Sequence, residues 1–159
     1  MNLPANFFIQ KVTISHAEEI FDILWRVYNE QPKGFPMGGS WTRSLLKTEL
    51  EEGDGIGVFN ASHYLKAFAL YRSTHQALDI SVLATCPTQR KQGLMTAVLS
   101  SLKSLIQKDQ EIWVDVHAEN HPAIRLYQSQ GFQQLGLRQG YYRDGGDAFL
   151  FTWAPEEVN

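Results

Sequence analysis

The chain has 159 residues, 43% of them hydrophobic and 19% charged, which is typical of a globular protein, excludes the disordered and low-complexity classes and fits one domain over residues 1–159. The formal net charge of -3 gives no broad positive field, so we expect neither nucleic acid nor a membrane among its partners. We expect no metal, because the sequence contains one cysteine and shows no Cys/His cluster with zinc spacing. We expect a cytoplasmic protein, because we find no secretory leader and no apolar segment of about eighteen residues.

The first third of the chain predicts a strand followed by helices. Residues 7–14 alternate as a strand does, and Ser15 and Glu18 then have the spacing of a capping box. A segment rich in Gly and Pro interrupts the helical pattern over residues 31–40. The expected order is a strand over 7–14, a helix to about Asn29, a loop over 31–40, and a helix from Trp41 to about Glu52.

The middle of the chain predicts three strands, a helix and a further strand. The strands cover residues 56–60, 64–72 and 78–85 and are expected to form an antiparallel meander. A helix from Gly93 to about Lys108 follows, and residues 112–117 are rich in β-formers. A strand, a helix and a strand in this order predict a parallel crossover.

The C-terminal part begins with a helix whose two ends are marked. Asn120 can cap its start, Pro122 fits the first turn because its missing N–H costs nothing there, and Gly131 is a suitable stop. Strands over 132–138 and 148–153 follow, and the loop between them contains three glycines. The whole pattern predicts an α/β (α+β) fold.

A glycine turn in front of the third predicted helix offers a site for an anion. The turn has the sequence Arg90-Lys91-Gln92-Gly93-Leu94-Met95. A helix start leaves about four backbone N–H groups without partners, so the amides from Gln92 to Thr96 could converge on a phosphate. The alternative is a tight turn with a solvated pair of charges, and the spacing is not that of a nucleoside-triphosphate loop.

Two further segments extend this pattern. The chain reads Leu83-Ala84-Thr85-Cys86-Pro87 before the turn and Asn120-His121-Pro122-Ala123-Ile124-Arg125-Leu126-Tyr127, then Gly131-Phe132, after it. With these motifs the chain resembles the GNAT acetyltransferases, and among them the bacterial ribosomal-protein alanine N-acetyltransferases, strongly from about Leu78 to Trp153. The resemblance implies a mixed, mostly antiparallel sheet of about seven strands, splayed in the middle, with about four helices.

The resemblance also implies acetyl-CoA as co-substrate. Its pantetheine would lie along the strand at Leu83, its pyrophosphate at the glycine turn, and its thioester near Tyr127. The family has Gly or Ala at the position of Met95, a departure that affects the space for the phosphates. The residues expected at acetyl-CoA are Leu83, Ala84, Thr85, Arg90, Lys91, Gln92, Gly93, Leu94, Met95, Thr96, Asn120 and Tyr127.

Two side chains are the expected catalytic groups. In the family the position of Tyr127 donates a proton to the departing thiolate, and that of Asp115 accepts one from the amine, directly or through water. Each also has a structural interpretation, as a core aromatic with its hydroxyl at the surface and as a hydrogen-bonded carboxylate. Glu119 and His117 are the competing bases, while Cys86 is expected to be a buried small hydrophobe without a paired base.

The acceptor is expected to be a primary amine held by the Tyr141-Tyr142 pair, in a loop that resembles the family's hairpin over the acceptor peptide. A protein N-terminal α-amine fits best, because its pKa near 8 makes deprotonation easier than for lysine. The partner could then be a ribosomal protein, and the chain a monomer or homodimer. The alternatives are a small-molecule amine as acceptor, or a silent module that binds acyl-CoA.

Overall fold

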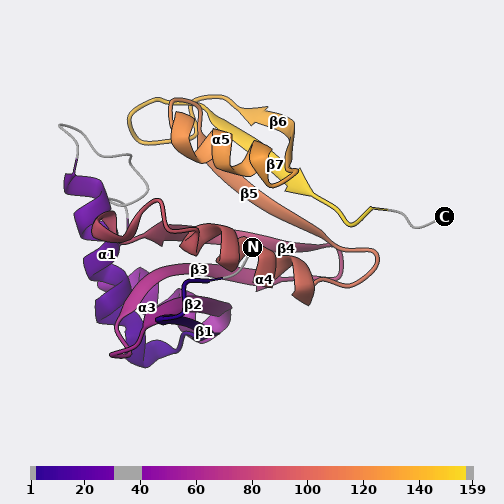
Figure 1. The fold of residues 1–159 in the computed structure, drawn as a ribbon. Coiled ribbons are helices and arrows are strands. Elements are labelled where there is room, and N and C mark those ends of the chain that lie inside the picture. The colour runs from indigo at the N-terminus through magenta and orange to yellow at the C-terminus, as the bar shows by residue number, and fades with distance from the viewer. Residues whose placement is uncertain (1–2, 31–40, 157–159) are drawn as a thin grey trace.

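The computed structural model describes residues 3–30 and 41–156, so the loop expected over 31–40 lies outside the described residues. The described chain forms one seven-stranded sheet with strand order β1-β2-β3-β4-β5-β7-β6 (Figure 1). Its strands are β1 (Phe7–Lys11), β2 (Asp54–Asn60), β3 (Leu65–Ser73), β4 (Ala77–Thr85), β5 (Glu111–His117), β6 (Gln133–Arg138) and β7 (Ala148–Trp153). Its helices are α1 (Ala17–Asn29), α3 (Arg43–Glu52), α4 (Leu94–Leu105) and α5 (His121–Ser129), with 3-10 turns η1 (Ile14–His16) and η2 (Pro87–Gln89).

The expected capping box near the N-terminus was placed two residues too late. The backbone N–H of Thr13 donates to Nδ1 of His16 at 2.9 Å, and this pair starts the 3-10 turn η1 in place of Ser15 and Glu18. The second predicted helix also starts later than expected. Thr42 caps α3 by accepting the N–H of Leu45 at 3.1 Å, so the helix begins after Trp41.

The expected meander and crossover are both confirmed. Strands β2, β3 and β4 pair antiparallel in sequence order, and β4 pairs parallel with β5 across α4. The parallel pairing joins Ala77–Ile80 to residues 111–114, and beyond these residues the two strands diverge. Figure 1 shows β5, β7 and β6 with α5 leaning away from the part of the sheet formed by β1 to β4. The predicted splayed sheet is therefore confirmed.

A β-bulge lies at the point where the two strands separate. On β3, Leu70 pairs with Val82 and Tyr71 pairs with Ile80, so Ser81 has no partner residue in this register. The extra residue changes the face on which the following side chains lie. Ile80 packs in the core beneath α4 and α5, whereas Val82 packs in the core beneath α1 and α3.

Helices cover both faces of the sheet, which creates two hydrophobic cores. The core on the α4 side contains Val98 and Leu102 of α4 and Tyr127 of α5. The core on the α1 side contains Ile20 of α1 and Leu46 of α3. Within residues 3–30 and 41–156, no helix combines the length and the apolar character that crossing a bilayer requires.

Candidate active site

Two cavities open where β4 and β5 separate. The first, of about 540 Å³, lies among α3, β3, β4, β5 and the loop over residues 139–147, and is named here the loop-side cavity. The second, of about 390 Å³, lies among α1, β4, α4, β5 and α5, and is named the helix-side cavity. Leu83, Asp115 and Tyr127 line both of them. These three residues therefore mark the junction between the two cavities.

The edge of β4 that faces the junction carries backbone groups without a strand partner in the described chain. The N–H of Cys86 donates to the carbonyl of Lys66 on β3 at 2.8 Å. Successive N–H groups of a strand point to opposite sides. The N–H groups of Thr85 and Leu83 therefore point away from β3, toward the separation between β4 and β5.

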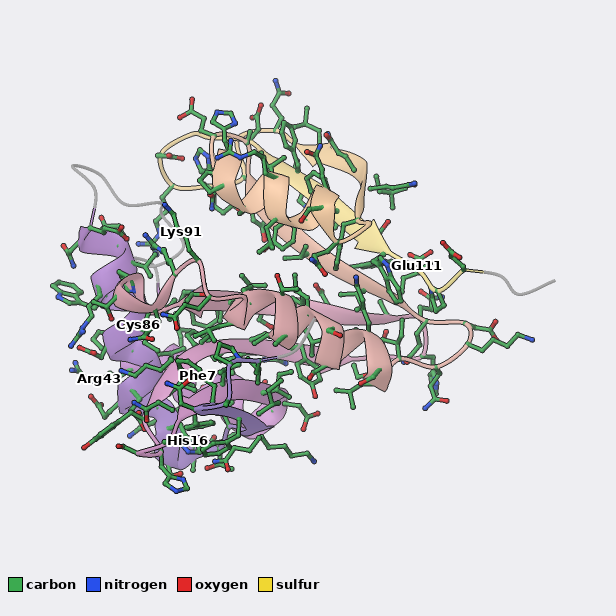
Figure 2. All side chains as sticks on the ribbon, viewed as in Figure 1. Phe7, His16, Arg43, Cys86, Lys91 and Glu111 are labelled. Carbon is green, nitrogen blue, oxygen red and sulfur yellow. The ribbon has the colours of Figure 1, made fainter. Side chains whose placement is uncertain are left out.

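The glycine turn in front of α4 has the conformation that a close approach to an anion requires. Gly93 has φ 77° and Lys91 has φ 64°, both in the left-handed region. Among the described residues no side chain caps α4, which leaves its first N–H groups exposed to a ligand. Figure 2 shows the Lys91 side chain projecting from this turn toward the half of the molecule that carries α5.

The residues predicted at the cofactor occupy different positions around the helix-side cavity. Leu83, Ala84, Thr85, Arg90, Met95, Asn120 and Tyr127 line it. Lys91, Gln92, Gly93, Leu94 and Thr96 are absent from its lining and lie in the turn or the first turn of α4. The Leu94 side chain is 1% exposed, so only its backbone could reach a ligand.

The guanidinium of Arg90, in the turn before α4, already forms an ion pair with a carboxylate. Arg90 Nη1 donates to Oε1 of Glu30, which lies at the end of α1 and lines the same cavity. Sequence reasoning placed Arg90 at the cofactor but had no signal for its acidic partner. Any phosphate that reaches Arg90 must compete with Glu30 or share the guanidinium with it.

Helix α5 carries Tyr127 to the junction. The Oδ1 of Asn120 accepts the N–H of Ala123 at 3.3 Å, which confirms the predicted cap at the start of this helix. The Tyr127 ring is 2% exposed and packs against Phe132 and Phe151. Burial, with a smaller contribution from Tyr142, raises the pKa of Tyr127 well above its ordinary value. The phenol therefore stays protonated at neutral pH.

Asp115 lies on β5 at the same junction and has a cationic neighbour. Its Oδ1 accepts from Arg138 Nε at 3.3 Å. The charge of Asp115 adds to the effect of burial in raising the pKa of Asp79. A partly exposed carboxylate with one long ion pair keeps lone pairs available for an amine or a water.

Glu49 is a buried carboxylate in the loop-side cavity that sequence reasoning missed. It accepts from Arg72 Nε at 3.0 Å and Nη2 at 2.7 Å, and from the Ser81 hydroxyl at 2.5 Å. The hydrogen bonds from Arg72 are the main reason that the pKa of Glu49 lies below its ordinary value. Its neighbours Glu51 and Glu52 on α3 look alike in the sequence, and Glu52 also pairs with Arg72 at 3.0 Å. What distinguishes Glu49 is its burial and the hydrogen bond from Ser81, 32 residues away.

The predicted acceptor residues Tyr141 and Tyr142 both line the loop-side cavity. Tyr142 stacks on the ring of His117, with centroids 4.9 Å apart and planes 24° apart. Its hydroxyl is buried without a hydrogen-bond partner among the described residues. Burial, followed by the charge of Asp115, raises the pKa of Tyr142 above its ordinary value.

The competing bases and the cysteine have surroundings that favour structural roles. His117 is 3% exposed and its Nε2 lies 2.9 Å from Oδ2 of Asp144, so this competing base already has an acidic partner. The backbone N–H of Glu119 donates to the same ring, at Nδ1. Cys86 is buried at 4% exposure in the core beneath α1. Within the described residues, His, Cys, Asp and Glu side chains form no group of three that could hold a metal ion.

A family profile, a sequence relative and a solved structure all identify similar proteins as acetyltransferases. The sequence profile of the acetyltransferase (GNAT) family matches residues 17–132. A protein from Bacillus subtilis named putative [ribosomal protein bS18]-alanine N-acetyltransferase is 36% identical over 117 residues, which are 71% of this chain and 78% of that protein. The crystal structure of the ribosomal-protein-S18-alanine N-acetyltransferase from Escherichia coli superposes with a TM-score of 0.78 at 23% identity, covering 96% of this chain and 99% of the other.

An archaeal relative is similar over a shorter stretch. The N-alpha-acetyltransferase of Saccharolobus solfataricus is 34% identical over 73 residues, which are 44% of each chain. The similarity thus spans less than half the length of this relative.

Proposed function

This chain belongs to the GNAT acetyltransferase family, and we propose that it transfers the acetyl group of acetyl-CoA directly to a primary amine, the α-amine of a protein N-terminus. The observation that carries the proposal is the junction: Leu83, Asp115 and Tyr127 line both cavities at once. A thioester that enters from the helix side and an amine that enters from the loop side would meet at these residues. Direct transfer requires such a meeting point, because the reacting atoms must lie side by side.

The helix-side cavity supports binding of acetyl-CoA. Its wall includes the free edge of β4, where outward N–H groups could bind the amides of pantetheine, and the turn before α4 could bind the pyrophosphate. Lys91 would add positive charge, and Arg90 would turn from Glu30 toward a phosphate. Met95 packs in the core while it forms part of the wall, so it shapes the cavity without filling it.

The chemistry follows from the groups at the junction. Asp115, or a water that it binds, would take a proton from the ammonium, and the amine would attack the thioester carbon. The N–H of Leu83 would donate to the developing oxyanion, and such a donor contributes roughly 3 kcal/mol. As the new C–N bond forms and the C–S bond breaks, Tyr127 would give its proton to the thiolate. The nitrogen would lose its second proton to solvent, from which the Tyr127 phenolate regains a proton.

The loop-side cavity supports a peptide as the acceptor. It is lined by aromatic side chains, Trp41, Tyr141 and Tyr142 among them, and by the carboxylate of Asp115, which favours an ammonium group. The Glu49 carboxylate in the same wall is already bound by Arg72. Relatives named for N-alpha-acetylation and for ribosomal-protein alanine acetylation point to the same class of acceptor. We therefore favour a protein N-terminus, such as that of a ribosomal protein, over a small amine.

Thiol release from acetyl-CoA tests the proposal. The purified chain would be incubated with peptides that begin with free Ala, Ser or Met, with the same peptides blocked at the N-terminus, and with polyamines and free amino acids. We expect coenzyme A release and a mass gain of one acetyl group only with free N-termini. Release with polyamines or amino acids alone would support a small-molecule acceptor. Calorimetric binding of acetyl-CoA without release for any amine would identify a silent module.

A further inference from the structure

His117 is a buried histidine whose two ring nitrogens bind two different segments. The backbone N–H of Glu119 donates to Nδ1 at 3.1 Å, so Nδ1 carries a lone pair. The proton of the neutral ring must then lie on Nε2, which is 2.9 Å from Oδ2 of Asp144. His117 thus joins the β5–α5 turn to the loop over residues 139–147 in one tautomer.

The loop is held against this ring through several contacts. Asp144 uses its second oxygen, Oδ1, to accept the N–H of Gly146 at 2.8 Å. Gly146 lies so close to the imidazole that a Cβ there would overlap Nε2. The carbonyl of Gly146 accepts the N–H of Tyr142 at 3.1 Å. The loop therefore has its polar groups and its packing arranged around His117.

The same ring is the surface on which Tyr142 rests. The two rings stack at 4.9 Å, Tyr142 lines the loop-side cavity, and its buried hydroxyl has no partner among the described residues. A buried hydroxyl without a partner costs free energy unless a ligand supplies one. Its position depends on the plane of the His117 ring beneath it.

We propose that His117 and Asp144 are positioning residues for the acceptor: their hydrogen bond fixes the plane of the His117 ring, and the ring places Tyr142 in the wall of the loop-side cavity. This inference rests on the proposed function, because it takes that cavity as the acceptor site. Neither residue touches the helix-side cavity. A loss of the pair should therefore weaken the acceptor and leave acetyl-CoA unaffected.

Asp144→Asn is the decisive variant, because the Asp144 side chain is 49% exposed and its replacement leaves the cores intact. A carboxylate accepts from both Nε2–H and the Gly146 N–H, whereas the amide has one oxygen for the two donors. We expect the KM for the acceptor peptide to rise roughly tenfold, with kcat changed less than about twofold. The KM for acetyl-CoA should stay unchanged. Asp109→Asn, on an exposed residue between α4 and β5, is the matched control.

A double-mutant cycle separates positioning from general stability. His117→Phe keeps a ring under Tyr142 but removes the donor to Asp144, so adding Asp144→Asn to it should have little further effect on the acceptor KM. His117→Gln keeps a donor for Asp144 and removes the ring, so it should raise the acceptor KM as well. Thermal melts of each variant show whether it is folded.

The outcomes are distinguishable. A wild-type protein that acetylates peptides, combined with an Asp144→Asn variant of unchanged acceptor KM, would overturn this inference alone. Equal effects of Asp144→Asn in the wild type and in His117→Phe would overturn it too. A wild-type protein that acetylates no free N-terminus would overturn the proposed function and the inference together. If the His117 variants do not fold, the Asp144→Asn kinetics decide.

Discussion

Arg90 and Glu30 form an ion pair at 2.5 Å between the turn before α4 and the end of α1. The carboxylate lines the helix-side cavity, so it adds negative charge at the place proposed for the phosphates of acetyl-CoA. Glu30→Gln removes that charge and releases the guanidinium. We expect the Kd for coenzyme A to fall about threefold, as measured by calorimetry at low salt. In Arg90→Ala, the same change at Glu30 should have a smaller effect, and weaker binding in Glu30→Gln would contradict the proposed place of the phosphates.

Gly93→Ala tests the turn itself. The left-handed φ of 77° at Gly93 costs an alanine about 1 to 2 kcal/mol, and the strain would shift the amides that we place around the pyrophosphate. Gly131, with φ 85° at the end of α5, is the matched control because it carries the same strain away from both cavities. Both alanine variants should lose stability in urea unfolding, but only Gly93→Ala should bind coenzyme A more weakly.

Tyr127→Phe removes one hydroxyl at the junction. The ring stays packed between Phe132 and Phe151, so the variant should fold as the wild type does. Loss of the proposed proton donor should lower kcat about a hundredfold. The Kd for acetyl-CoA should change little. Stopped-flow thiol release and calorimetry measure the two quantities, and an unchanged kcat would show that solvent protonates the thiolate.

Glu49→Gln tests the buried carboxylate of the loop-side cavity through stability and pH. The pKa of Glu49 lies below its ordinary value of 4.5 because Arg72 binds the ionised form. Its ionised state therefore stabilises the fold above that pH, and this contribution disappears as the pH falls from 4.5 through the lower native pKa.

We expect Glu49→Gln to lose about 1 to 2 kcal/mol of unfolding free energy at neutral pH, and the difference from the wild type to shrink in acid. Urea titrations at several pH values measure it. The exposed neighbour Glu51 supplies the control, Glu51→Gln, with no change expected. A difference that stays constant down to pH 3 would mean that the charge of Glu49 does not matter.

Local patterns were sufficient to predict most of the architecture. The meander, the crossover through α4 and the cap at Asn120 each depend on residues close together in the chain, and all three are confirmed. The capping box before α1 was misplaced because Thr13 and His16 cap the 3-10 turn η1 with a histidine acceptor, which the usual Ser/Thr and Glu pattern does not describe.

The sequence predicted the positions of candidate-site residues that belong to a motif, but it did not predict ion pairs between residues far apart in the chain. Asp115 and Tyr127 belong to one motif, and they do come together at the junction. The catalytic roles of these two residues stay predictions. Glu49 with Arg72 and Glu30 with Arg90 are pairs between segments far apart in the chain, and a single sequence contains no signal that joins them.

The separation of β4 from β5 has a consequence for how this protein could diversify. The surface proposed for the donor includes α1 and α4, whereas the surface proposed for the acceptor includes α3 and the loop over residues 139–147. Substitutions in the loop over residues 139–147 could then change the choice of amine without altering the turn before α4 that we propose binds the nucleotide. The fold could therefore accept a new amine substrate while its proposed binding site for acetyl-CoA stays the same.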